Sequence, residues 1–147
     1  MAVVVDTNVW VVAAGSSLEA GPECVDACAS RLLAFESSET LAVDSDYRIF
    51  REYYDNLPVN SAQVQLLNRL QQTGRYDPCL CEWEAGAPGV AVVPDVLRCL
   101  DPNDRKFAAV ALTFRPPARI LNAADPDWQE CAAACLEAGL PVEELCP

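Results

Sequence analysis

Histidine is absent from this chain of 147 residues, and basic residues are few. Without an imidazole base, serine or cysteine catalysis that relies on one is excluded, as is histidine-ligated zinc. The 22 acidic residues face only 10 basic ones, so the net charge is -12. This balance argues against a protein that binds nucleic acid through a broad basic face. A nuclease still fits if part of the charge is a carboxylate cluster that metal ions neutralise.

Long hydrophobic runs are also missing. No apolar stretch approaches the roughly 18 residues that would suggest a membrane span. The first residues lack the basic start and long apolar run of a secretory signal, because Asp6 interrupts them almost at once. We therefore expect no membrane partner and a cytoplasmic location. The length suits a single domain, 1–147, and the hydrophobic content of 52% supports one sizeable core without disulfides.

Cysteine, by contrast, is abundant, with eight residues at Cys24, Cys28, Cys79, Cys81, Cys99, Cys131, Cys135 and Cys146. Cys24 with Cys28, and Cys131 with Cys135, are four residues apart on predicted helices, so each pair shares one helical face. A structural thiolate site or a disulfide framework would use such pairs. The spacings do not form the CxxC…CxxC pattern of a zinc ribbon. We interpret the cysteines as small apolar core residues of a reducing compartment.

Short apolar segments alternate with amphipathic ones along the whole chain. The valines at 3–5 predict a strand that is buried on both faces. We expect further strands at 41–43, 90–93, 119–122 and 140–142, and helices at 7–14, 22–35, 45–57, 61–72, 101–114 and 127–138. Residues 75–89 predict a partly ordered connection. The alternation predicts an α/β fold, with a mostly parallel sheet and helices on both of its faces.

Carboxylates recur at the ends of these elements. Asp6 closes the first strand, Asp104 begins a helix, and Asp125 and Asp127 follow the strand at 119–122, while Glu52 lies within the helix at 45–57. Ligands of open α/β sheets bind at the carboxyl ends of the strands. Two carboxylates about 4 Å apart repel by roughly 4 kcal/mol at an effective dielectric constant of about 20, so a cluster needs cations or protons. Hard oxygen ligands suit Mg²⁺ or Mn²⁺, which activate water and clamp phosphodiester oxygens.

Each acidic residue also has a purely structural explanation. Asp6 is a good cap for the helix that follows it. Asp104 and Asp127 are favoured at helix starts by the macrodipole, by about 0.3–1 kcal/mol each. Glu52 has Arg48 four residues earlier as an ion-pair partner. Three further acidic residues are interpreted as capping or solvated residues and not as ligands: Asp44, Asp46 and Asp101.

Four segments resemble, in order, the acidic motifs of PIN-domain ribonucleases: Val4-Val5-Asp6-Thr7-Asn8-Val9, Arg48-Ile49-Phe50-Arg51-Glu52-Tyr53, Asp101-Pro102-Asn103-Asp104-Arg105-Lys106-Phe107 and Asn122-Ala123-Ala124-Asp125-Pro126-Asp127-Trp128. The resemblance covers nearly the whole chain. It implies a three-layer α/β/α sandwich with five parallel strands in the order 3-2-1-4-5. It also implies a Mg²⁺- or Mn²⁺-dependent endoribonuclease. Many bacterial members are toxins held inactive by a cognate antitoxin, so the implied partners are RNA, an antitoxin and a second copy of the chain.

The same resemblance assigns roles to individual residues. It makes catalytic carboxylates of Asp6, Glu52, Asp104 and Asp125, and metal ligands of Asp6, Asp104 and Asp125 or Asp127. The family commonly has a small Thr/Ser-Gly pair before its last aspartate, where this chain has 122–124 as Asn-Ala-Ala. That departure leaves the choice between Asp125 and Asp127 open. Five polar neighbours of the acidic positions are the candidates for contacting substrate: Thr7, Asn8, Arg51, Arg105 and Lys106.

Two other classes of function fit these residues. A PIN-like fold that no longer cleaves would serve as a binding or scaffold module, and scattered acidic residues would favour it. A different metal-dependent phosphoesterase would act on a small phosphate ester, and a narrow closed pocket would favour it. An open groove with basic rims would favour RNA. Fold analogy alone does not choose between these classes.

Overall fold

A single five-stranded sheet forms the centre of the computed structural model, which describes residues 1–146. The strands are β1 (Ala2–Val5), β2 (Thr40–Asp44), β3 (Tyr76–Cys79), β4 (Arg119–Asn122) and β5 (Val142–Glu144). They are all parallel and lie in the order β3-β2-β1-β4-β5. The predicted α/β fold with strand order 3-2-1-4-5 is therefore confirmed.

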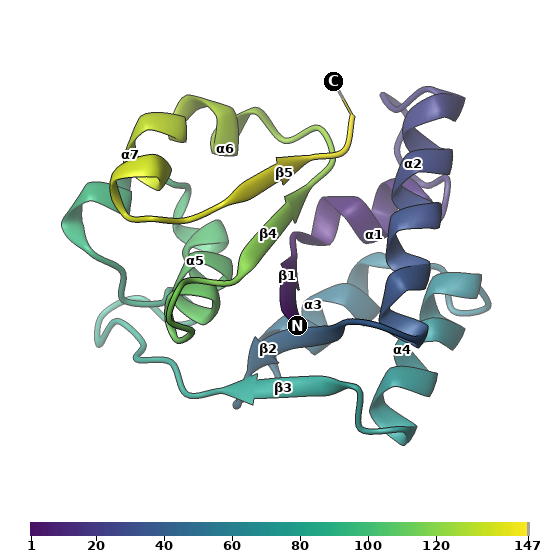
Figure 1. Ribbon diagram of the computed structural model, residues 1–147, viewed down its shortest axis with the longest axis horizontal. Helices are drawn as coiled ribbons and strands as arrows, with labels where there is room; N and C mark the ends of the chain where they lie inside the picture. The colour runs from purple at the N-terminus through teal and green to yellow at the C-terminus, as the bar shows by residue number, and fades with distance from the viewer. Residues whose placement is uncertain (147) are drawn as a thin grey trace.

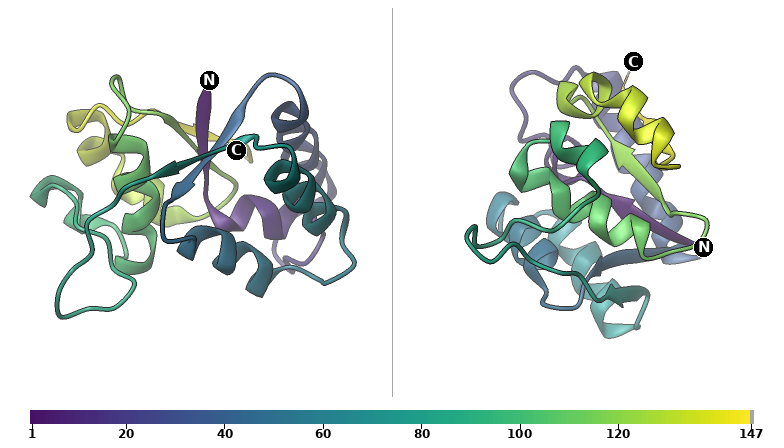
Figure 2. Two further views of the ribbon diagram at one scale, coloured as in Figure 1. Left: turned by 90° about the horizontal axis from the view of Figure 1, so that it is seen from below. Right: turned by 90° about the vertical axis from the view of Figure 1, so that its left-hand side faces the viewer.

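Helices cover both faces of this sheet. The helices are α1 (Thr7–Ala13), α2 (Pro22–Leu32), α3 (Arg48–Asn56), α4 (Ala62–Gln72), α5 (Arg105–Leu112), α6 (Pro126–Glu130) and α7 (Ala132–Glu137), with 3-10 turns η1 (Leu33–Glu36), η2 (Asp95–Cys99) and η3 (Pro102–Asp104). Helices α1 to α4 lie on one side and α5 to α7 on the other (Figures 1 and 2). Among residues 1–146, no helix has both the length and the apolar character needed to cross a bilayer.

The core lies between the central strands and these helices. The valines of β1 at 3–5 are completely buried, as expected for a parallel strand covered on both faces. Helix α5 packs across β1, β2 and β4 on one face. On the other side, the buried Tyr53 hydroxyl of α3 donates a 2.5 Å hydrogen bond to the Val5 carbonyl oxygen. The carboxyl end of β1, where Asp6 follows, is thereby fixed from both sides.

The third strand does not lie where the sequence predicted it. Residues 90–93 make only an isolated antiparallel bridge, between Ala91 and Trp83, while β3 comes from the predicted connection. Pro78 lies within β3 and has no N–H to donate, which an edge strand tolerates because only one side is paired. Ala91 and Val93 are buried, so the apolar character of 90–93 reflects packing against the core and not membership of the sheet.

Other boundaries differ by a few residues. The predicted helix at 127–138 is two short helices divided at Cys131, and the last strand begins at Val142. The helix expected from residue 45 begins at Arg48, because Tyr47 adopts a left-handed conformation with φ of 59°. Helix α3 thus begins next to Asp44, whose carboxylate accepts the first backbone N–H groups of the helix.

Four of the eight cysteines are paired in disulfides, Cys24 with Cys146 and Cys99 with Cys131. The interpretation of all eight as free core residues is therefore wrong for these four. The free cysteines are Cys28, Cys79, Cys81 and Cys135. The first disulfide ties the end of the chain to α2, and the second ties η2 to the junction of α6 and α7. Neither joins the helical neighbours that the spacing had singled out.

Replacing Asp44 by alanine should destabilise the fold. Its fully buried carboxylate accepts hydrogen bonds from the backbone N–H groups of Arg48 (3.0 Å) and Ile49 (2.8 Å). Alanine leaves both donors without an acceptor, so we expect the free energy of unfolding to fall by about 2–3 kcal/mol. Urea denaturation measures this. Asp55→Ala, at an exposed position of α3, is the control, and an equal loss in both variants would contradict the capping role of Asp44.

Candidate functional site

Three aspartates meet beyond the carboxyl ends of β1 and β4. Asp6 caps the start of α1, Asp104 ends η3 just before α5, and Asp125 caps α6. Each offers a carboxylate oxygen, and these oxygens all lie within 4.8 Å of one another. They come together because β1 and β4 are parallel neighbours, with Val5 opposite Leu121, so the segments that follow both strands emerge side by side. This is also the point where the strand order reverses, where open α/β sheets bind ligands.

Asp6 is the most enclosed of the three carboxylates, with 4% of its surface exposed. One oxygen accepts the Asn8 backbone N–H (3.0 Å), and the other accepts the indole N–H of Trp128 (2.7 Å). The capping explanation of Asp6 is thus correct, and it does not exclude a second role. Trp128 was not among the predicted site residues, although a buried indole N–H usually requires an acceptor.

A pair of asparagines holds the segment after β4 against the start of α1. The Asn8 side chain donates to the side-chain oxygen of Asn122 (2.9 Å) and accepts the Ala123 backbone N–H (2.9 Å). The fully buried Asn122 donates in turn to the Asp125 carbonyl (2.9 Å) and to the Glu144 carboxylate (2.7 Å). Asn8, predicted to contact substrate, therefore positions Asp125 relative to Asp6. The role of Asn122 was missed by the sequence analysis.

Glu52 lies near the three aspartates but outside their convergent set. It accepts a hydrogen bond from the Thr7 hydroxyl, and its other oxygen lies 2.8 Å from the Lys106 ammonium. Lys106 is the only lysine of the chain and has 5% of its surface exposed. Its ammonium also donates to the Asn103 carbonyl. The charge of Glu52 is therefore balanced within the protein, by a residue that had been predicted to bind substrate.

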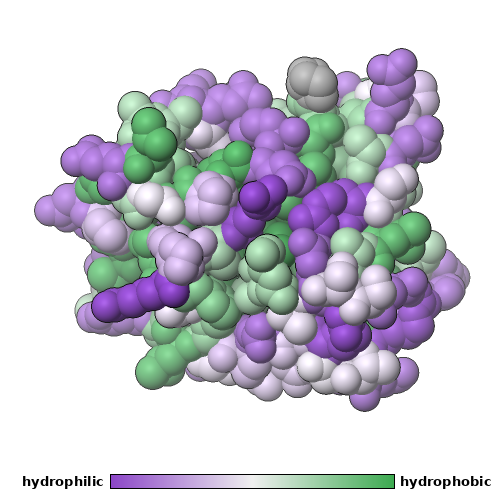
Figure 3. All heavy atoms as spheres, viewed as in Figure 1, coloured by the Kyte–Doolittle hydropathy of each residue, from purple (hydrophilic) through white to green (hydrophobic). Residues whose placement is uncertain are grey.

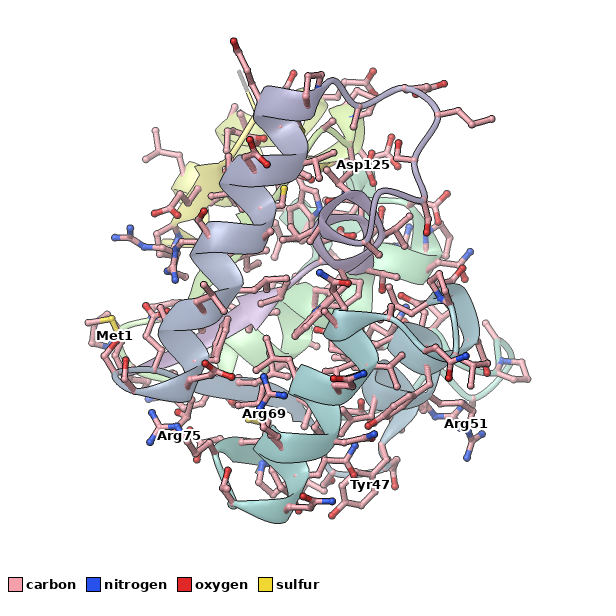
Figure 4. All side chains as sticks on the ribbon, turned by 90° about the vertical axis from the view of Figure 1, so that its right-hand side faces the viewer. Met1, Tyr47, Arg51, Arg69, Arg75 and Asp125 are labelled. Carbon is pink, nitrogen blue, oxygen red and sulfur yellow. A yellow bond between two sulfur atoms is a disulfide. The ribbon has the colours of Figure 1, made fainter. Side chains whose placement is uncertain are left out.

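The predicted arginines lie further from the carboxylates or already have partners. The Arg105 guanidinium donates hydrogen bonds to the carbonyls of Leu100 (3.1 Å) and Arg98 (2.9 Å). These bonds stabilise the segment that precedes Asp104. Arg51 is exposed and points outward, well away from Asp125 (Figure 4). Contact of these residues with a substrate stays a prediction.

Arg48, the expected partner of Glu52, instead lies over the Trp83 ring, 4.8 Å from its centroid. The ion pair between Arg48 and Glu52 is absent among the described residues. All three acidic residues interpreted as capping or solvated have a structural role, and that of Asp44 is to accept the first N–H groups of α3. Asp101 accepts the Asn103 backbone N–H (2.9 Å), and Asp46 accepts the Trp83 indole N–H (2.7 Å).

The geometry distinguishes Asp125 from Asp127. Asp125 contributes an oxygen to the convergent set, and Asp127 does not. The backbone N–H of Asp127 donates to the Asp125 carboxylate (2.9 Å), which fixes the side chain that reaches toward Asp6 and Asp104. Asp127 itself is partly exposed at the first turn of α6. The structure therefore brings Asp125, and not Asp127, to the position expected of a shared ligand.

Burial and mutual repulsion disfavour full ionisation of this cluster. Burial raises the pKa of Asp6 to about 6, against the opposing effect of its hydrogen bonds from Asn8 and Trp128. Burial, followed by repulsion from Asp6 and Asp125, raises the pKa of Asp104 to about 8. Within residues 1–146, no lysine or arginine forms an ion pair with any of the three. A hard divalent cation such as Mg²⁺ or Mn²⁺ suits this set of oxygen donors and its uncompensated charge.

A separate apolar cavity of about 500 Å³ lies between α6, α7 and β5. Its walls include Leu136, Leu140 and Val142, and hydrophobic side chains gather over this part of the surface in Figure 3. Trp128 lines this cavity and also donates to Asp6, so one side chain contacts both regions. The cavity contains no set of convergent charged groups, so the carboxylate cluster is the better candidate for catalysis.

Metal binding should depend on Asp104 and Asp125 but not on Asp127. We expect Mn²⁺ to bind the wild-type protein, and Asp104→Asn or Asp125→Asn to weaken binding on the order of 100-fold, since each removes a charged oxygen. Asp127→Asn, a charge change of the same kind two residues away, is the matched control and should change the affinity little. Isothermal titration calorimetry measures the affinities. Equal losses in the Asp125 and Asp127 variants would contradict the assignment.

The raised pKa values also predict how stability depends on pH without metal. Because burial and repulsion raise the pKa of Asp104 from its ordinary value of 3.8 to about 8, its carboxyl favours the folded state when protonated. That contribution is complete below about pH 4 and is lost as the pH rises through about 8. We expect Asp104→Asn to melt at a higher temperature than wild type at pH 8, and the difference to shrink toward pH 5.

Addition of Mn²⁺ should stabilise wild type more at pH 8 than at pH 5, because binding then displaces fewer protons. Differential scanning fluorimetry across this range measures both effects. A melting temperature of Asp104→Asn that tracks wild type at every pH would contradict this account of the site's electrostatics.

Comparison with known proteins provides no independent assignment. No protein-family model, curated protein or solved structure matches this chain. The case for a function therefore depends on which side chains the fold brings together and on the chemistry that they can perform.

Proposed function

We propose that this chain is a PIN-like, divalent-metal-dependent endoribonuclease whose centre is formed by Asp6, Asp104 and Asp125. The observation that carries the proposal is the convergence of these carboxylates, from three separate segments, at the edge of the sheet where β1 and β4 end. Scattered carboxylates would have favoured a binding or scaffold module. The order of the four acidic motifs along the chain, which resembles that of PIN-domain ribonucleases, supports RNA as the substrate.

The residues of the cluster would bind the cation in fixed orientations. Asp6 is held by Asn8 and Trp128, and Asp125 is held through Asn122 and its own first-turn hydrogen bond. Asp104 would give up its proton as the cation binds, because a nearby positive charge lowers the pKa that burial and repulsion raise. A bound Mg²⁺ or Mn²⁺ supplies an activated water and neutralises charge on the phosphate oxygens.

Glu52 is better suited to accept a proton than to bind the ion. It stands outside the convergent set, and the Lys106 ammonium, 2.8 Å away, balances its charge and holds one of its oxygens. The Thr7 hydroxyl holds its other oxygen. We therefore assign Glu52 as the carboxylate that orients the attacking water and takes its proton, with Thr7 and Lys106 as its positioning residues.

The net charge of -12 constrains how RNA would be held. With 10 basic residues in the whole chain, few of them can neutralise phosphates, so binding should depend weakly on salt and strongly on the metal. By the resemblance to PIN-domain toxins, the proposed protein partners are an antitoxin and a second copy of the chain.

Cleavage of a fluorescent single-stranded RNA should require Mn²⁺ or Mg²⁺ and be abolished by EDTA. We expect Asp104→Asn and Glu52→Gln to lower the rate on the order of 100- to 1,000-fold, because each removes a charged group acting in the transition state. Glu52→Gln should retain Mn²⁺ affinity to within a few-fold, whereas Asp104→Asn should lose it. This contrast separates a proton acceptor from a metal ligand.

Asp127→Asn, purified in parallel, is the control for a contaminating nuclease and should cleave at the wild-type rate. Equal cleavage by wild type and Asp104→Asn would overturn the proposal. Metal-dependent hydrolysis of p-nitrophenyl phosphate without cleavage of RNA would instead favour a phosphoesterase acting on small esters. Metal binding with neither activity would favour the non-cleaving binding module.

A further inference from the structure

We propose a second metal site, separate from the aspartates, in which the thiolates of Cys24, Cys28 and Cys146 bind a soft cation such as Zn²⁺ when the disulfide between Cys24 and Cys146 is reduced. This site requires no nuclease activity. It lies where the chain after β5 runs beside the N-terminal end of α2 (Figure 1). The three sulfur atoms lie within 4.8 Å of one another.

The spacing of the sulfurs fits tetrahedral coordination. Cys24 and Cys28 are one turn apart on the same face of α2, and the end of the chain brings Cys146 to them. The sulfurs of Cys28 and Cys146 are 3.8 Å apart. With Zn–S bonds of about 2.3 Å, a tetrahedral site separates neighbouring sulfurs by about 3.8 Å. Opening the disulfide would let the third sulfur move to a similar distance from its neighbours.

A disulfide alone does not account for Cys28. The bond between Cys24 and Cys146 already ties the end of the chain to α2 and needs no third sulfur. Cys28 is completely buried and free, yet it lies against the pair. A cavity of about 340 Å³ adjoins the cluster and is lined in part by Cys24, Cys146 and Glu23. This cavity leaves room for a fourth ligand, either water or the Glu23 carboxylate.

The composition of the chain assigns the two sites to different cations. Because histidine is absent, the side-chain ligands available to a soft-metal site here are thiolates and carboxylates. The aspartate cluster offers hard oxygen ligands, and the cysteine cluster offers soft sulfur ligands. A dithiol reductant would supply two electrons and two protons to the disulfide and become a disulfide itself. The incoming cation would then replace the protons of the three thiols.

Cobalt titration of the reduced protein tests this site. The protein carries Cys99→Ser and Cys131→Ser so that only one disulfide is reduced, and the dithiol reductant is removed in the absence of oxygen. We expect about one equivalent of Co²⁺ to give sulfur-to-metal charge-transfer absorption in the near ultraviolet, which Zn²⁺ then removes. The oxygen ligands of the aspartate cluster give no such band. The unreduced protein should show none either.

Cys28→Ser and Cys146→Ser should each weaken Co²⁺ binding by at least about tenfold and reduce the intensity of the band. Cys81→Ser, at a partly buried free cysteine outside the cluster, is the matched control and should leave the band unchanged. Circular dichroism checks that each variant is folded, since Cys28 is buried and Cys146 packs against the core. Absence of the band in the reduced protein, or a band indifferent to both substitutions, overturns the proposal.

Discussion

Repulsion among three converging carboxylates is the constraint around which this end of the sheet is built. One carboxylate oxygen of each of Asp6, Asp104 and Asp125 lies within 4.8 Å of the others. They meet because β1 and β4 are neighbours and because η3 ends at Asp104 beside them. Buried donors then hold the side chains in place: Trp128 on Asp6, and Asn122 behind Asp125. Without a cation, the raised pKa values of Asp6 and Asp104 make this arrangement costly near neutral pH. The cation proposed above would offset this repulsion and so stabilise the folded protein.

The basic residues closest in sequence to the cluster do not offset the repulsion among the three aspartates. The single lysine is committed to Glu52, and Arg105 to backbone carbonyls. Glu52 is thereby paired beside the cluster and lies outside the set of three converging aspartates. At this end of the sheet, three aspartates converge without a basic partner, while Glu52 beside them is paired with Lys106. A sulfur cluster lies elsewhere, between α2 and the end of the chain.

Much of this arrangement could be predicted from the sequence, because it depends on local patterns. The valine strand that ends at Asp6 and the order of the acidic motifs are readable along the chain, and the structure brings three of those carboxylates together. What could not be read depends on tertiary packing. The edge strand β3 contains Pro78, which resembles a break, and the pairing of Lys106 with Glu52 joins helices distant in sequence. Disulfide partners are likewise set by the fold, since spacing alone allows many pairings.

The most direct test is the anomalous diffraction of crystals soaked in Mn²⁺. We expect an anomalous peak between the carboxylates of Asp6, Asp104 and Asp125, within coordination distance of an oxygen of each. The peak should be absent from crystals of Asp104→Asn grown and soaked in the same way, while the side chains of Asn122 and Trp128 keep their positions. A folded wild-type protein with no peak among these three residues, or with Mn²⁺ bound only elsewhere, would contradict the central claim.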